Sequence, residues 1–262
     1  AVERVGRARR RADLTPLVAR TETTAAVLLA SVDYGEADRI VTLLTEAHGK
    51  VALMARGARK SRRRFAGALE PYALLEAELA LGRGEVGRLA QARVVRAFPR
   101  VLGSLERIAA AAAGLELVRE TASAHEAPDA RLLPTVARFF ERVEGAAPEA
   151  LDAVHFAFAL RLLALTGHAP NLERCGACGR PAPAGKAALF APRAGAIVCR
   201  ACGGGPHVLA GPLRMAMLRA GTRAWDEDDA DLGAGGLAPL RAFLEWPLGK
   251  PLAAGAMRDQ VR

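Results

Sequence analysis

The chain has 262 residues, of which 51% are hydrophobic and 25% are charged. This composition supports a large buried core and excludes a disordered chain. No stretch approaches the roughly 18 consecutive apolar residues of a membrane span, and no apolar segment follows the basic N-terminus, so we expect neither a membrane protein nor a secretory signal. Four cysteines are too few for a disulfide scaffold, which favours a reducing, cytoplasmic location.

The positive charge is concentrated in the first part of the chain. The net charge is +9, and residues 1–100 contain 19 lysines and arginines against 11 acidic residues, whereas residues 101–262 contain 18 against 17. A genome rich in arginine codons would affect both parts alike, so it does not explain the difference. The asymmetry predicts that the N-terminal part binds a polyanion, and nucleic acid is the commonest such partner.

The first 100 residues indicate a basic extension followed by a small barrel. Residues 1–18 are rich in arginine and show no period, so we interpret them as an extension. Short apolar runs then alternate with glycine turns, which is typical of antiparallel strands. The expected strands cover residues 26–32, 39–45, 51–56, 72–79 and 88–95. Five strands predict an OB-type barrel over residues 19–100, although the sequence does not separate it from an SH3-like barrel.

Beyond Pro99 the apolar residues recur at helical spacing. Helices are expected over residues 104–121, 130–143, 148–166, 212–225 and 237–246. Ser104 is placed to cap the first helix, and Pro134 fits only the first turn of the second. The third is almost entirely apolar and ends before Gly167, so it should form the buried centre of a bundle. We therefore expect an α+β multidomain protein with an all-α bundle over residues 101–262.

All four cysteines fall into two C-x₂-C pairs, Cys175 with Cys178 and Cys199 with Cys202. Two such pairs 20 residues apart are typical of structural zinc, because each pair forms a tight knuckle and four thiolates complete a tetrahedral shell. The apolar residues between them can form a short hairpin, so a zinc insertion is expected at about residues 172–206. Two redox-active pairs or an iron–sulfur cluster are the alternatives. His207 could replace one ligand, but four cysteines already fill the shell.

The densest run of positive charge lies between Arg56 and Phe65, directly after the third expected strand. In an OB barrel this connection lies beside the face that binds oligonucleotides. Arginine can bind phosphate with two hydrogen bonds and stack on bases, and Phe65 offers a further stacking surface. The alternative is a solvated loop whose Phe65 is anchored in the core. The candidate DNA contacts are Arg39, Lys50, Arg56, Arg59, Lys60, Arg62, Arg63, Arg64 and Arg88.

Several of these segments together resemble the RecO family of bacterial DNA repair and recombination mediators. They are residues 37–45, 48–50, 56–60, 65–71, and 162–170 followed by Cys175 and Cys178. The resemblance covers roughly residues 22–250 and implies an N-terminal OB fold and a helical domain with a zinc insertion. It also implies binding of single- and double-stranded DNA, annealing of complementary strands, and partnership with RecR to help RecA replace single-stranded-DNA-binding protein. Residues 1–18 depart from the family pattern.

No enzyme motif accompanies these features. The sequence has no Walker A loop and no His-Glu metalloprotease or deaminase motif. Residues 226–229 are four consecutive carboxylates, but side chains on one exposed loop cannot all converge on one metal ion. We therefore expect a non-enzymatic DNA-binding mediator in the cytoplasm, associated with the nucleoid, with RecR and single-stranded-DNA-binding protein as protein partners. The alternatives are a zinc-containing RNA-binding or ribosome-associated protein and a metal-dependent nuclease.

Overall fold

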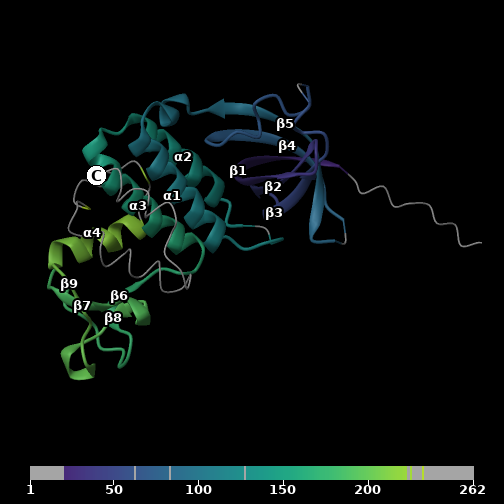
Figure 1. The fold of residues 1–262 in the computed structure, drawn as a ribbon. Helices are drawn as coiled ribbons and strands as arrows, with labels where there is room; N and C mark the ends of the chain where they lie inside the picture. The colour runs from purple at the N-terminus through teal and green to yellow at the C-terminus, as the bar shows by residue number, and fades with distance from the viewer. Residues whose placement is uncertain are drawn as a thin grey trace, which may run out of the picture.

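Five strands close into a barrel in the computed structural model, which describes residues 21–222 except 62, 83 and 127, together with residues 225 and 232. The strands are β1 (Glu22–Tyr34), β2 (Asp38–Thr45), β3 (Gly49–Ala55), β4 (Ala73–Ala80) and β5 (Val86–Ala97). They pair in the order β1-β2-β3-β5-β4, and β5 runs parallel to β3 while the other pairs are antiparallel. This order is that of the OB fold and not of an SH3-like barrel. The predicted OB-type barrel is therefore confirmed (Figure 1).

Alternating side chains fill the interior of the barrel. In β3, Val51, Leu53 and Ala55 are buried while the residues between them are half-buried, because successive side chains of a strand point to opposite faces. Leu43 of β2 and Leu79 of β4 are fully buried in the same cluster. The barrel therefore has a hydrophobic core of its own, and its charged residues lie outside it.

Four helices follow the barrel in the part of the chain that the structure describes, and they agree with the first four that the sequence predicts. They are α1 (Leu105–Thr121), α2 (Leu132–Gly145), α3 (Leu151–Leu165) and α4 (Gly211–Thr222). Ser104 caps α1 by accepting a hydrogen bond from the backbone N–H of Arg107. α3 follows a 3₁₀ turn at Pro148–Ala150 and packs against the other three helices, so it forms the buried centre of the bundle. The fifth expected helix, at residues 237–246, lies outside the described residues.

None of the helices in the described part of the chain is long and apolar enough to cross a membrane. The longest, α1, has 17 residues and carries charged side chains along its length.

The barrel and the helices share one hydrophobic cluster. Phe98, which follows β5, packs against Phe140 of α2, and their ring centroids are 5.4 Å apart. At the start of β3, Gly49 has a φ angle of +62°, and a Cβ atom there would collide with the carbonyl oxygen of Glu126 at 2.4 Å and make a tight contact with that of Ser123 at 3.0 Å. These contacts fix the barrel against the helical domain.

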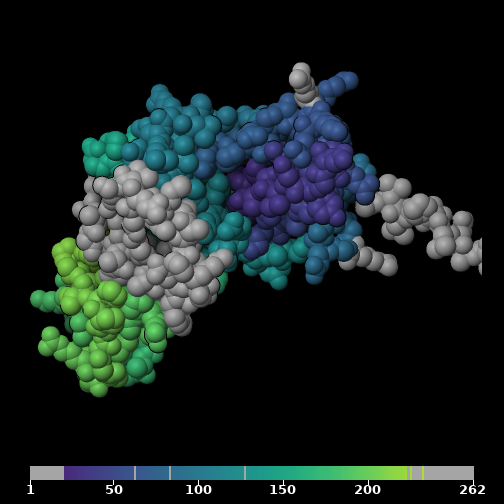
Figure 2. All heavy atoms as spheres, in the orientation of Figure 1, coloured from purple at the N-terminus to yellow at the C-terminus, as the bar shows by residue number. Residues whose placement is uncertain are grey.

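A small sheet carrying the four cysteines lies between α3 and α4. Its strands are β6 (Asn171–Cys175), β7 (Ala188–Ala191), β8 (Ala196–Ile197) and β9 (His207–Leu209), in the order β6-β8-β7-β9. β7 and β8 form the expected antiparallel hairpin. We call residues 171–210 the cysteine element. It lies at the opposite end of the helical domain from the barrel (Figures 1 and 2).

Arg214 of α4 attaches the cysteine element to the helices. Its side chain is fully buried and donates hydrogen bonds to the carbonyl oxygens of Leu172 at 2.8 Å and Lys186 at 3.1 Å, and also to that of Pro183. A buried guanidinium group is costly unless its donors are satisfied. Because all three acceptors belong to the cysteine element, these hydrogen bonds hold that element in one position against α4.

Candidate metal centre and nucleic-acid interface

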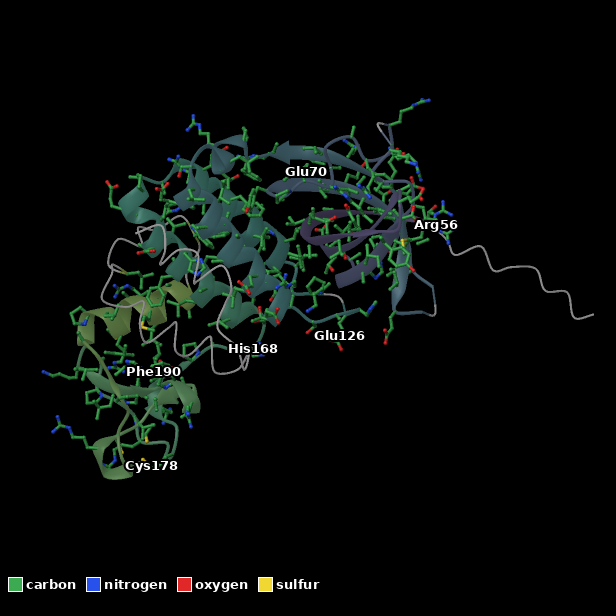
Figure 3. The ribbon with its side chains drawn as sticks, in the orientation of Figure 1. Arg56, Glu70, Glu126, His168, Cys178 and Phe190 are labelled. Atoms are coloured by element: carbon green, nitrogen blue, oxygen red, sulfur yellow. The ribbon has the colours of Figure 1, made fainter. Side chains whose placement is uncertain are left out.

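The four cysteines come together at the tip of the cysteine element, where Figure 3 labels Cys178. Cys175 ends β6 and Cys178 lies in the turn after it, while Cys199 precedes and Cys202 ends a 3₁₀ turn after β8. The four Sγ atoms all lie within 4.8 Å of one another, and those of Cys178 and Cys199 are 3.9 Å apart. Four thiolates around one zinc ion at the usual Zn–S length have Sγ atoms about 3.8 Å apart. The cluster therefore has the dimensions of a tetrahedral metal site.

Hydrogen bonds within the cluster favour a charged sulfur atom at Cys175. The backbone N–H of Cys199 donates to its Sγ at 3.4 Å, and together with the amides of Cys178 and Ala177 it lowers the pKa of Cys175 to about 6. Hydrogen bonding with the Cys199 and Cys178 thiols, in contrast, raises the pKa of Cys202. Four neighbouring thiolates repel one another, and a divalent cation would remove that repulsion. The donor set therefore fits a metal ion.

The neighbouring residues agree with the sequence pattern. Gly179 and Gly203 follow the two C-x₂-C pairs with φ angles of +71° and +100°, which allow the backbone to turn beneath the cluster. His207 lies in β9, and its ring is not among the donor atoms that meet at the cluster. The four cysteines predicted as ligands are thus the residues that can hold a metal ion.

The run of positive charge after β3 forms a loop, residues 56–65, that is tied to the barrel at both ends. The backbone N–H of Gly57 donates to Oδ1 of Asp38 at 2.7 Å. At the other end of the loop, the backbone N–H of Ala92 in β5 donates to the carbonyl oxygen of Arg64 at 2.9 Å. The loop therefore lies over the end of the barrel at which β1 turns into β2, and Arg56 marks this end in Figure 3.

Most of the predicted DNA contacts meet at this end of the barrel. Arg39 lies opposite Ala55, the last residue of β3, and Arg88 of β5 lies opposite Met54. Both are therefore close to the start of the basic loop. We call the following residues the barrel basic surface: Arg39, Arg56, Arg59, Lys60, Arg63, Arg64 and Arg88. Arg62 lies outside the described residues.

Asp33 forms ion pairs with two of these arginines. Oδ1 of Asp33 is 3.0 Å from Nε of Arg39, and its Oδ2 is 3.4 Å from Nε of Arg59. Arg64 donates a hydrogen bond to the carbonyl oxygen of Arg56 at 2.7 Å, which shapes the loop without neutralising the charge. The remaining five cations are exposed and form no ion pair with any residue that the structure describes. They are Arg56, Lys60, Arg63, Arg64 and Arg88.

Lys50 lies apart from the barrel basic surface. It stands near the other end of β3, roughly 17 Å along the strand from Ala55. Its ammonium group donates to the carbonyl oxygen of Arg119 in the last turn of α1 at 2.5 Å. Lys50 therefore lies at the junction between the barrel and the helices, and the structure does not bring it together with the other candidates.

The aromatic residue at the basic surface is not the one that the sequence suggested. Phe65 is 3% exposed and belongs to the core of the barrel, so the suggestion that it stacks on bases is wrong. Tyr34, at the end of β1 beside Asp33, is 56% exposed. Strand alternation gives no signal for it, because residues 31–34 at the end of β1 are all exposed. Tyr34 is therefore the candidate stacking residue.

The described residues thus form an OB-barrel protein whose helical domain carries a four-cysteine element. Family models described as "Recombination protein O N terminal" and "Recombination protein O C terminal" match residues 20–98 and 102–254. The DNA repair protein RecO of Anaeromyxobacter sp. (strain K) is 39% identical over 245 residues, which cover 90% of this chain and 94% of that protein. The protein of the same name from Myxococcus xanthus is 42% identical over 178 residues, 68% of this chain and 71% of that protein. The chain belongs to the RecO family of DNA repair and recombination proteins.

Proposed function

We propose that this chain is a DNA-binding recombination mediator that binds single- and double-stranded DNA and anneals complementary strands. The observation that carries the proposal is the set of exposed, unpaired cations on the barrel basic surface. Lysines and arginines that contact phosphates release condensed counterions, and this supplies affinity for any sequence. Membership of the RecO family supports the same function, because its curated relatives are named as DNA repair proteins.

On a single strand, the cations bind the phosphates while Tyr34 stacks on a base. Stacking on an aromatic ring is tolerant of sequence, because every base has a flat face. Arg39 and Arg59 pair with Asp33, the neighbour of Tyr34 in the chain, so these arginines lie at the same end of β1 as Tyr34. Neutralised phosphates repel a second strand less strongly, so complementary bases meet more often. The barrel thus promotes annealing through charge neutralisation.

We further propose that the metal is Zn²⁺ and that its role is structural. Cys175, Cys178, Cys199 and Cys202 would hold it, and thiolate ligands favour a soft metal of this kind. When bound, the ion stabilises a sheet whose strands are only two to five residues long. Four protein ligands leave no open position for a substrate, which supports a role in folding over one in catalysis.

The proposal includes protein partners and no enzymatic activity. With RecR, the mediator would help RecA replace single-stranded-DNA-binding protein, in the cytoplasm and at the nucleoid. The family resemblance supports these partners, and the missing Walker A loop supports annealing without nucleotide hydrolysis. A pull-down of the purified chain with purified RecR tests the first partnership, and an absence of binding at low salt would contradict it.

The function itself is tested by fluorescence annealing of complementary strands without nucleotide or magnesium. The Lys60→Ala/Arg63→Ala variant should anneal more slowly, and its salt slope for single-strand binding should fall by about 1.4, since each lost phosphate contact lowers it by about 0.7. The matched control is Arg131→Ala/Arg138→Ala, which loses the same charge from arginines paired to Asp129 and Glu141. Its slope should equal that of the unmodified protein.

Four outcomes would contradict the proposed function or its assignment to the barrel basic surface. A requirement for ATP, or cleavage of labelled DNA in the presence of a divalent metal ion, would return the enzyme alternative. Tighter binding to RNA than to DNA of the same sequence would favour the RNA-binding alternative. An equal loss of salt slope in the barrel variant and the control would show that net charge alone determines affinity, without a defined surface.

A further inference from the structure

The cysteine element is the most basic segment of the C-terminal part of the chain. Residues 171–210 contain five lysines and arginines against one acidic residue, whereas residues 101–170 contain six against nine. The acidic excess of residues 101–170 conceals this difference when charge is counted over the whole C-terminal part. The cysteine element and the barrel basic surface lie at opposite ends of the helical domain (Figure 1).

The cations of the cysteine element are free to bind a ligand. All five are exposed, and none forms an ion pair within the part of the chain that the structure describes. They are Arg174, Arg180, Lys186, Arg193 and Arg200. In the helical domain, by contrast, Arg131 is paired with Asp129 at 2.7 Å, and Arg138 with Glu141 at 2.7 Å. The lack of neutralising carboxylates is therefore a local property of this element.

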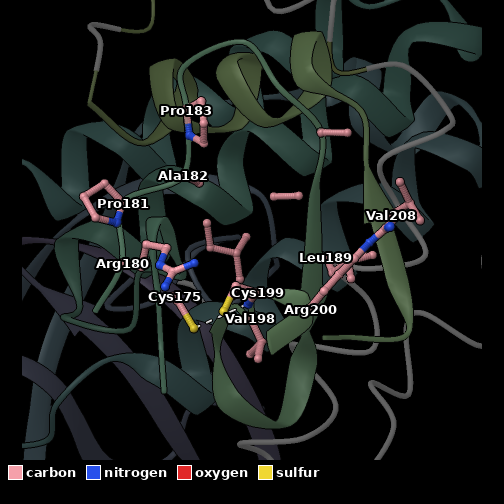
Figure 4. Close-up of a pocket in the computed structure, with 13 residues that line it drawn as sticks. Cys175, Arg180, Pro181, Ala182, Pro183, Leu189, Val198, Cys199, Arg200 and Val208 are labelled. Atoms are coloured by element: carbon pink, nitrogen blue, oxygen red, sulfur yellow. Dashed lines mark hydrogen bonds between the residues drawn. The ribbon is translucent and has the colours of Figure 1, made fainter. Parts of the chain in front are cut away.

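Two of these arginines border an apolar hollow of about 300 Å³ (Figure 4). Arg180 lies on one side and Arg200 on the other, and Figure 4 shows the space between them. Leu189, Val198 and Val208 line the hollow, and Val208 is 69% exposed although it is apolar. This volume is at the lower bound of small-molecule sites and is large enough for one flat group such as a nucleobase. The hollow thus combines an apolar floor with a cation on two sides.

We propose that the cysteine element is a second binding site for single-stranded DNA, in which Arg180 and Arg200 bind phosphates and the hollow accepts an unstacked base. An apolar floor receives the flat face of a base, and guanidinium groups bind phosphate oxygens with two hydrogen bonds. The other three cations extend the positive surface beyond the hollow. Such a surface suits a ligand with a chain of phosphates better than a small ligand with one carboxylate. The proposal rests on the proposed function, since it assumes that the protein binds DNA.

Two sites at opposite ends of the molecule have a direct consequence for annealing. The barrel basic surface can hold one strand while the cysteine element holds the other, and residues 101–170, which join these two parts of the chain, have an acidic excess that attracts neither strand. The strands are therefore kept apart until their complementary segments pair. A protein with one site would instead place both strands in competition for the same cations.

The test uses the zinc-loaded full chain and a short oligothymidylate that covers one site. The unmodified protein should bind two equivalents at low salt. Arg180→Ala/Arg200→Ala should bind one, and its salt slope for binding a longer single strand should be lower by about 1.4. Val208→Asp should also remove the second equivalent, because it places a carboxylate in the hollow. Arg131→Ala/Arg138→Ala is the control matched for charge, and it should bind two.

Zinc content and melting temperature distinguish loss of the site from loss of the fold. Both should equal those of the unmodified protein in the Arg180→Ala/Arg200→Ala variant, because these side chains are exposed. If the unmodified protein binds only one equivalent of oligothymidylate, and Lys60→Ala/Arg63→Ala abolishes that binding, the second site is overturned. The proposed function would still stand. No oligothymidylate bound by any form of the protein would refute the proposed function itself. Binding of two equivalents of oligothymidylate by both Arg180→Ala/Arg200→Ala and Val208→Asp would also overturn the proposal of a second site.

Discussion

Asp33 should limit the DNA affinity of the barrel basic surface. Its two carboxylate oxygens lie 3.0 Å from Nε of Arg39 and 3.4 Å from Nε of Arg59. Asp33→Asn removes the charge and retains nearly the same shape, so it releases both guanidinium groups for phosphates. Exposed ion pairs contribute only about 0.2–1 kcal/mol each to stability. The variant should therefore remain folded and bind DNA more tightly.

The size of the effect follows from counterion release. Each phosphate contact adds about 0.7 to the salt slope for a single strand, so two freed arginines should steepen it by about 1.4. When salt is lowered from about 200 mM to about 50 mM, the ratio of variant to unmodified affinity should then grow about sevenfold. Glu70 lies 3.9 Å from Arg39 and is largely exposed, so it would recapture little of that charge.

Fluorescence anisotropy titrations of single-stranded DNA over this salt range measure the slope. Asp38→Asn is a matched control, because it changes the net charge by the same amount near the same strand end. Asp38 accepts a hydrogen bond from the backbone N–H of Gly57 at 2.7 Å, which asparagine can also accept. Equal gains in the two variants would show that net charge, and not the release of Arg39 and Arg59, sets the affinity. An unchanged slope in Asp33→Asn would refute the placement of the site.

Three further outcomes are expected. Cys199→Ser should lower both zinc content by metal analysis and melting temperature, because it removes one of four ligands. Gly49→Ala should lower the free energy of urea unfolding by roughly 1–3 kcal/mol, since the new Cβ meets the carbonyl oxygen of Glu126 at a positive φ. Hydrogen bonding to Arg138 lowers the pKa of Glu141 below 4.5, so its stabilisation is present above that pH and lost as the pH falls through the lowered pKa. Glu141→Gln should therefore cost about 0.5–1 kcal/mol at neutral pH and less under acid conditions, as measured by urea unfolding at both pH values.

The elements of the fold could be predicted because their signals are local. Alternation along β3 and helical spacing along α2 are visible within a dozen residues. The parallel pairing of β3 with β5 joins Met54 to Arg88, which are distant in sequence. The count of five strands suggested an OB barrel, but only this pairing separates it from an SH3-like barrel. The 3₁₀ turn at Pro148–Ala150 was likewise not visible, because a helical pattern does not distinguish a 3₁₀ start from an α-helical one.

The two candidate sites differ in how far the sequence could define them. Each cysteine pair is a local motif, so the four candidate ligands and the hairpin between them could be predicted from spacing alone. Which cations are free depends on contacts between distant segments. Lys50 and Lys60 look alike in sequence, yet Lys50 donates to the carbonyl oxygen of Arg119 while Lys60 is exposed. Phe65 and Tyr34 differ in the same way, because burial depends on which side of the barrel wall each residue faces.

Net charge counted over long segments is a poor guide to where a polyanion binds. Residues 1–20 contain six lysines and arginines against two acidic residues, and residues 21–100 contain 13 against nine. Half of the N-terminal excess therefore lies outside the barrel, and Asp33 neutralises part of the rest. The cysteine element has a net charge as large as that of residues 21–100 in half the length, although the C-terminal part as a whole is nearly neutral. Because phosphates respond to cations within about a Debye length, unpaired cations gathered on one surface determine affinity more than the net charge of the segment that contains them.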